Sequence, residues 1–141
     1  MYGDTTVIRA LARTLREQGS EIRAEAEELR GRAEAAPWTG VAADAMRRLA
    51  EDHAGCLRAC AEIHEEAAEA LERHSRAVDH LEALIAAAER RAMRLLDGAA
   101  GVAHALVSHV VPSAVDHWLA HFEPPPHGSM EWLEVHVPGS A

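Results

Sequence analysis

The chain has 141 residues, a formal net charge of -9 and few aromatic side chains. This length suits one domain, and the acidic balance argues against nucleic-acid binding, which requires a basic patch. All of the cationic residues are Arg and none is Lys, a usage typical of high-G+C bacteria such as actinobacteria. Because Ala and Leu dominate and both favour helices, we expect an all-α fold.

The first long helix is predicted to begin at Asp4 or Thr5 and to reach about Ala36. Asp and Thr are favourable N-cap residues, and apolar residues then recur at steps of three and four, as on one helix face. This stripe consists of Ile8, Leu11, Leu15, Ile22, Ala26, Leu29 and Ala33. Pro37 disfavours helical backbone at the residue before it, so Pro37-Trp38-Thr39-Gly40 is predicted to be a turn.

A second, longer helix is predicted from about Val41 to Asp97. Its apolar seam repeats in heptad fashion: Met46, Leu49, His53, Leu57, Cys60, His64, Ala67, Leu71, His74, Val78, Leu81, Ile85, Ala88, Ala92 and Leu95. The first helix is too short to cover this seam, and Ala buries little apolar area per residue. We therefore expect the antiparallel helical hairpin, residues 1–98, to complete its core by binding another helical chain. The residues chosen for that contact are Leu49, Leu57, Leu71, Val78, Leu81 and Ile85.

The C-terminal part is predicted to fold back on the hairpin. Gly98 and Gly101 favour a turn after the second helix, and residues 99–122 are apolar enough for a packed helical segment, with a kink or break at Pro112. The three prolines that follow favour extended backbone. Residues 123–141 are therefore predicted to be an extended tail, in which Trp132 and Leu133 could form a short docking turn.

The cysteine and histidine residues are candidates for disulfide formation and for metal binding. Cys56 and Cys60 lie four residues apart on one predicted helix face; we expect reduced thiols, with a disulfide to a partner or a metal pair as alternatives. His117 and His121 have a spacing that could hold a metal, but histidines at helix boundaries are more often polar surface groups. We therefore predict no metal and no cofactor.

Histidines recur along the seam of the second helix. His53, His64 and His74, together with His80, could set the register against a partner or act as a pH-sensitive lock. The sequence contains no nucleophile motif and no phosphate-binding loop, so we expect a binding protein and not an enzyme.

The Trp38-Thr39-Gly40 tripeptide between two long helices resembles the WXG (Trp-x-Gly) helical-hairpin superfamily of type VII, or ESX, secretion. The resemblance covers about residues 4–97. It implies a four-helix bundle, formed as a homodimer or with a WXG-like domain of a larger effector or toxin. It also implies that the chain is a co-secreted partner or targeting chaperone, with Trp38 and Gly40 as the turn and export motif.

The chain departs from this superfamily at the export signal. Many such pairs carry Tyr-x-x-x-Asp/Glu after the second helix, whereas the only tyrosine here is Tyr2. The chain is thus expected to take the signal from its partner, or to stay in the cell as a homodimeric scaffold or regulator. Residues 1–20 mix charges without an apolar core, so we expect no secretory signal peptide. The expected location is the cytoplasm, with any export by a signal-peptide-independent route.

Overall fold

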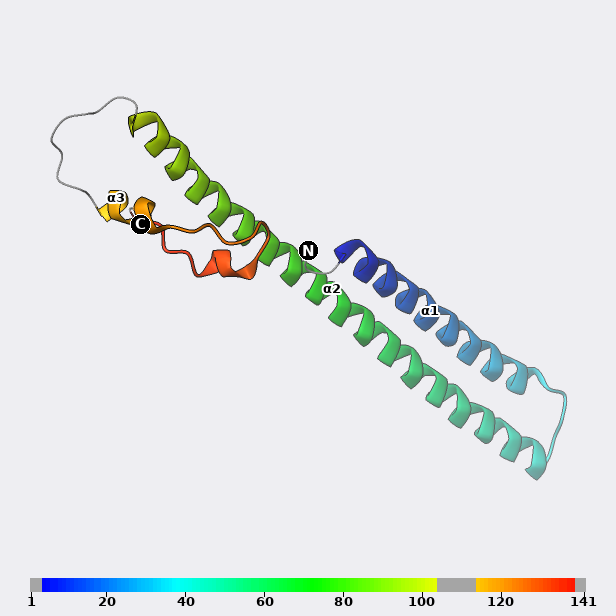
Figure 1. The fold of residues 1–141 in the computed structure, drawn as a ribbon. Coiled ribbons are helices and arrows are strands. Elements are labelled where there is room, and N and C mark those ends of the chain that lie inside the picture. The colour runs from blue at the N-terminus through cyan, green and yellow to red at the C-terminus, as the bar shows by residue number, and fades with distance from the viewer. Residues whose placement is uncertain (1–3, 104–113, 139–141) are drawn as a thin grey trace. The chain divides into compact units, whose positions relative to one another are not determined.

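The computed structural model describes residues 4–103 and 114–138 and is helical, with no strand among those residues. Helix α1 covers Thr5–Ala35, α2 covers Val41–Ala103 and α3 covers Ala114–His121, followed by a short 3-10 helix, η1, at Met130–Leu133 (Figure 1). The chain forms two compact units: Gly3–Ala77, and the part that begins at Val78.

Local sequence signals set both ends of α1. The Asp4 side chain accepts a hydrogen bond from the backbone N–H of Thr6 at 2.9 Å, which caps the N-terminus. At the other end, Ala36 has extended backbone, as the following proline requires. The predicted span of the first helix is therefore confirmed to within one residue.

The connection between α1 and α2 consists of residues 36–40. Gly40 has a φ of +99°, a conformation that a residue with a Cβ atom adopts only with strain. The Arg47 guanidinium donates hydrogen bonds to the carbonyl oxygens of Trp38 at 2.7 Å and Ala36 at 3.2 Å. A side chain of α2 thus provides hydrogen bonds to two carbonyl groups of the connection.

The two long helices pack through small residues, not through their large aliphatic side chains. The buried positions of α1 recur every seven residues, at Ala12, Gly19, Ala26 and Ala33. Those of α2 in the same unit are Ala43, Ala50, Ala54, Ala61, Ala68 and Ser75. A Cβ atom at Gly19 would lie 3.2 Å from the carbonyl oxygen of Ala61, so the backbones approach closely there.

This seam corrects the predicted one in part: the predicted Ala26 and Ala33 of α1 are buried, but the larger residues of the stripe are not. Ile8, Leu15, Ile22 and Leu29 flank the buried line of α1 and are half-buried, while Leu11 is exposed. On α2, most of the predicted seam residues likewise lie beside the buried line, whereas the predicted Ile85 and Ala92 are themselves buried. The two helices are antiparallel: Arg16 pairs with Glu72, Arg23 with Glu65, and Glu27 with Arg58, so later residues of α1 contact earlier residues of α2.

Helix α2 extends beyond its predicted end. The turn expected at Gly98 and Gly101 is wrong, because the helix continues through both residues to Ala103. Isolated glycines lower helix stability without necessarily ending a helix. The predicted kink at Pro112 lies outside the described residues, and the helical segment predicted for residues 99–122 is described at its end as α3.

The second unit has its own core around Trp132. The indole is 3% exposed and packs with Ile85 and Ala92 of α2, and partly buried side chains surround this cluster: Ala88, Trp118, Phe122, Val135 and Val137. The Trp132 Nε1–H donates to the carbonyl oxygen of Pro126 at 3.0 Å. The tail predicted to be extended thus contains a folded turn, η1, at Trp132 and Leu133, where the sequence suggests a short docking turn, in addition to its proline-rich extended stretch.

Glu89 of α2 binds the turn that precedes η1. Its carboxylate accepts the backbone N–H of Gly128 at 2.6 Å and lies 3.0 Å from His127 Nδ1. Gly128 has a φ of +73°, which favours glycine at this point of the turn. Ser129 then caps η1 by accepting the N–H of Glu131. The C-terminal segment is therefore held by polar contacts as well as by the burial of Trp132.

Candidate protein-binding surface

The pair formed by α1 and α2 in the first unit has one edge lined by ion pairs. Arg16 contacts Glu72 at 2.6 Å, and Arg23 contacts both carboxylate oxygens of Glu65, at 2.5 and 3.1 Å. Further along the same edge, Arg58 bridges Glu27 and Glu51. Arg9, Arg16, Arg23 and Arg30 recur every seven residues of α1, each three residues before one of the buried positions Ala12, Gly19, Ala26 and Ala33.

These contacts shift the ionisation of the groups that make them. The hydrogen bond from Arg23 lowers the pKa of Glu65, and that from Arg16 lowers the pKa of Glu72. The pKa values of the arginines are raised for the same reason. Because all of these side chains are partly exposed, the edge fixes the alignment of the helices more than it stabilises them.

The other edge of α2 has no formal charge. When the buried residues Ala54, Ala61, Ala68 and Ser75 are taken as position a of a heptad, every Asp, Glu and Arg from residue 53 to 77 falls at position b, e or f. Positions c, d and g form a continuous uncharged strip. We call it the α2 face: His53, Cys56, Leu57, Cys60, Ile63, His64, Ala67, Ala70, Leu71, His74 and Ala77.

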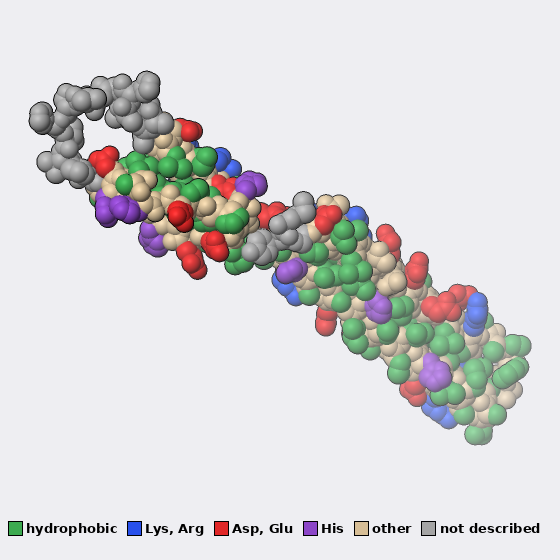
Figure 2. Space-filling model, viewed as in Figure 1, with side chains coloured by type: hydrophobic (Ala, Val, Ile, Leu, Met, Phe, Trp, Pro, Cys, Tyr) green, Lys and Arg blue, Asp and Glu red, His purple; other side chains and the backbone are tan. Residues whose placement is uncertain are grey.

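Much of the α2 face is accessible. Ile63 is 64% exposed, and Cys56, Ala70, His74 and Ala77 are also exposed. Figure 2 shows hydrophobic side chains with histidines among them over the α1–α2 pair. A strip of apolar and small side chains at helical spacing, free of charge yet open to solvent, suits contact with another helix.

The predicted partner-binding residues divide between the two units. In the first, Leu57 and Leu71 are half-buried members of the α2 face, and Leu49 is 55% exposed just before it. In the second, Val78 is half-buried and Leu81 is exposed. Ile85, expected to contact a partner chain, instead packs against Trp132 of its own chain, which leaves it nearly inaccessible.

Sequence reasoning missed Ile63, the large apolar residue most exposed on the α2 face. It was overlooked because the predicted seam was centred on Leu and His, one step away from the buried alanines. Its signal was the absence of charge at its heptad position: Cys56, Ile63, Ala70 and Ala77 occur every seven residues. Only the burial of Ala61 and Ala68 shows that this position faces outward.

Trp38 lies in the connection between the two helices. Its side chain is 62% exposed, so the indole contributes little to the core of the first unit. Thr39 and Gly40 are also exposed, and a Cβ atom at Gly40 would meet no other atom within 4 Å. Gly40 is therefore required for its backbone conformation and not for close packing.

Cys60 and His64 lie one helical turn apart on the α2 face. The Nδ1 atom of His64 is 2.9 Å from the carbonyl oxygen of Cys60, and because a carbonyl only accepts, this nitrogen carries the hydrogen. The Sγ atom of Cys60 is 3.9 Å from the same nitrogen. Both cysteines are free thiols.

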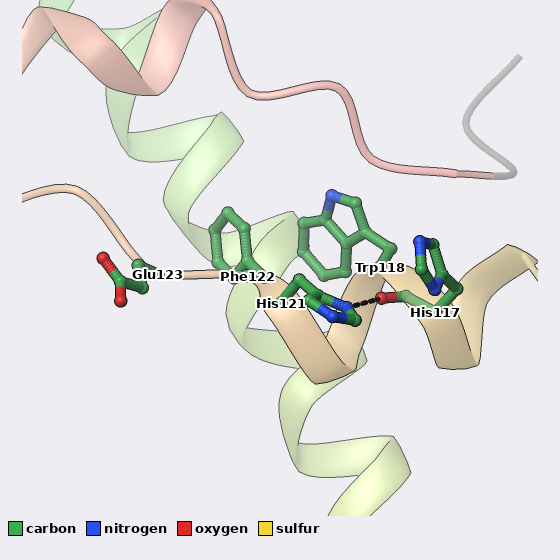
Figure 3. A pocket seen from close by; sticks show the side chains of 5 residues that line it. All are labelled: His117, Trp118, His121, Phe122 and Glu123. Atoms are coloured by element: carbon green, nitrogen blue, oxygen red, sulfur yellow. Dashed lines mark hydrogen bonds between the residues drawn. The ribbon is translucent and has the colours of Figure 1, made fainter.

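Helix α3 carries the histidine pair singled out as a possible metal site. His121 Nδ1 lies 3.0 Å from the carbonyl oxygen of His117 (Figure 3), so the ring is held back along the helix. The Trp118 and Phe122 rings stack with centroids 4.1 Å apart. Together with Glu123 these side chains line an open hollow. Among the residues that the structure describes, no three His, Cys, Asp or Glu side chains are arranged to hold a metal ion.

Comparison with protein families, with characterised proteins and with solved structures identified no match. Within the described ranges, no helix is both long enough and apolar enough to cross a membrane.

Proposed function

We propose that this chain is a helical binding protein whose hairpin, α1 with α2, associates with another helical hairpin. The observation that carries the proposal is the α2 face, which is uncharged and in large part accessible to solvent, although the chain as a whole is strongly charged. Isolated exposed apolar residues are common on protein surfaces, but a continuous strip of them at helical spacing is typical of a binding surface. The association would complete a four-helix bundle.

We further propose a role in type VII secretion, as a co-secreted partner or targeting chaperone of a WXG-like protein. The support is the Trp38-Thr39-Gly40 tripeptide in the short connection between two long helices, with an exposed indole and a glycine at positive φ. The partner would be a second copy of the chain or the WXG-like domain of a larger effector. Trp38 would then be available to contact the partner at the end of the bundle.

A second candidate function is that of a homodimeric scaffold or regulator that is never secreted. The specific observation in its favour is the missing Tyr-x-x-x-Asp/Glu signal, since Tyr2 is the only tyrosine. The two functions share the same binding surface and differ in whether the protein leaves the cell. Its accumulation in culture medium, compared between strains with and without an active type VII system, separates them.

The binding proposal is tested by co-expression with a WXG-like hairpin protein encoded beside it, followed by size-exclusion chromatography with light scattering. We expect a complex of defined stoichiometry, with this hairpin or between copies of the chain, and expect Ile63→Glu to disrupt it by placing a charge on the α2 face. The control is Val7→Glu, because Val7 is 62% exposed, almost as much as Ile63, but lies on α1. A complex that tolerates Ile63→Glu, or a chain that stays monomeric and binds no hairpin, would contradict the proposal.

A further inference from the structure

We infer that the α2 face associates with the α2 face of a second copy of this chain, with the two helices antiparallel. The inference rests on the proposed function and specifies its partner and geometry. The chain carries a net charge of -9, so two copies repel each other over most of their surfaces. The α2 face itself adds nothing to that repulsion, because no formal charge lies on it.

The outer border of the α2 face supplies the orientation. Beyond positions c and g, this border consists of the f positions, where Glu66 and Arg73 lie seven residues apart. In a two-fold symmetric antiparallel dimer, Glu66 of each copy lies beside Arg73 of the other, which gives two equivalent attractive pairs. In a parallel dimer the f positions of the two copies would lie on opposite flanks of the interface, so Glu66 and Arg73 of one copy would not meet those of the other.

The contact that Arg73 makes within its own chain does not prevent it from pairing with Glu66 of a second copy. Its guanidinium lies 3.6 Å from Glu69 on the same helix, and both side chains are well exposed. Exposed pairs four residues apart on a helix contribute little to stability. Arg73 can therefore pair with Glu66 of a second copy at little cost.

The same register brings complementary side chains together at the centre. Antiparallel helices that pair Glu66 with Arg73 place Ala67 opposite Ala70 of the other copy, and place Ile63 opposite His74. The small residues allow the two backbones to approach closely near the symmetry axis. The larger Ile63 and His74 then pack on either side of this point.

The size of the α2 face sets the expected strength. Residues 53–77 span about 36 Å of helix, a short contact that falls in the class of weak, reversible interfaces. We therefore expect a dimer with a dissociation constant in the micromolar range. Association should be measured over a wide concentration range, with the thiols kept reduced.

The test is sedimentation equilibrium of the full chain and of two charge-reversal variants. We expect Glu66→Arg and Arg73→Glu each to weaken self-association by about tenfold, because each creates two like-charged pairs. Mixed in equal amounts, the two variants should recover a dimer, since every pair in the mixed dimer is then attractive. The control is Glu62→Arg, which makes the same charge change on the same helix but away from the α2 face.

The outcomes separate this inference from the proposed function. The inference is wrong if the chain is monomeric throughout, if Glu66→Arg dimerises like the unmodified chain, or if the mixture fails to recover. In each of those cases, an association with another hairpin that is sensitive to Ile63→Glu would leave the proposed function standing. A dimer that weakens with Glu66→Arg and recovers in the mixture supports both.

Discussion

The close approach of α1 and α2 at Gly19 allows a test with a single methyl group. Gly19 and Gly31 both lie within α1, so replacing either with Ala should gain about 1 kcal/mol from helix propensity alone. A Cβ atom at Gly31 would meet nothing within 4 Å, whereas at Gly19 it would lie 3.2 Å from the Ala61 carbonyl oxygen, 3.4 Å from His64 Cβ and 3.5 Å from Glu65 Cγ. The two substitutions therefore share the gain in helix propensity and differ in whether the new methyl group contacts α2.

The expected difference follows from that contact. The nearest neighbour of the new methyl group is backbone, which cannot rotate away, so the helices must separate slightly. Overpacking of this kind costs about 1–3 kcal/mol. Gly31→Ala should raise the free energy of unfolding by about 1 kcal/mol. The free energy of unfolding of Gly19→Ala should be lower than that of Gly31→Ala by about 1–3 kcal/mol, so Gly19→Ala should be neutral or destabilising relative to the unmodified protein.

Urea denaturation followed by circular dichroism measures both variants, and thermal unfolding provides a second measure. A difference of 1 kcal/mol corresponds to roughly 4 °C in the melting temperature of a chain of this size. Gly55→Ala in α2 serves as a further control, because a Cβ atom there also meets nothing within 4 Å. If Gly19→Ala stabilises the protein as much as Gly31→Ala does, the two backbones do not approach closely and the small-residue seam is incorrect.

Two further predictions concern the second unit and the charged edge. Trp132→Ala should destabilise the second unit by about 3–5 kcal/mol. Amide hydrogen exchange around Ile85 should then become faster, with little change in α1. The control is Leu133→Ala, at a more exposed neighbour, which should have a small effect; equal effects of the two substitutions would show that Trp132 is not the core of this unit. Glu65 and Glu72 have lowered pKa values in the folded state, so their stabilising effect is present above the ordinary value of 4.5 and is lost as the pH falls below it through the folded-state values. Glu65→Gln/Glu72→Gln should therefore reduce the loss of stability on acidification in this range, and Glu17→Gln/Glu25→Gln should not; an unchanged acid profile in the first variant would show that these ion pairs do not form in solution.

The choice of seam residues shows the limit of periodicity arguments. Both the line of small residues and the line of Leu and Ile in α1 repeat every seven residues, and they lie only three residues apart. Hydrophobicity favours the larger residues as the core, which is why Leu15 and Ile22 were placed in the predicted seam. The small line is buried because it lets the backbones come close, a gain that depends on the facing residues of α2 being small too.

The C-terminal segment shows a different limit. Pro124–Pro126 and the turn glycine Gly128 are local signals, and they suggested non-helical chain. The docking of Trp132 depends on Ile85 and Ala92, and on a carboxylate at Glu89 that meets the Gly128 N–H. Ile85, Ala92 and Glu89 lie between 39 and 47 positions before the residues that they contact, and no pattern in the sequence links them.

The sequence by itself determined the all-helical character, the cap at Asp4, the end of α1 before Pro37 and the start of α2 after Gly40, because each follows from backbone preferences within a few residues. Only the tertiary structure decided which line of each helix is buried, that α2 continues past Gly98, and that Ile85 is covered by Trp132. Burial depends on how near a second segment of chain can come. That distance is set by pairs of residues far apart in sequence, so it becomes visible only when both are placed in space.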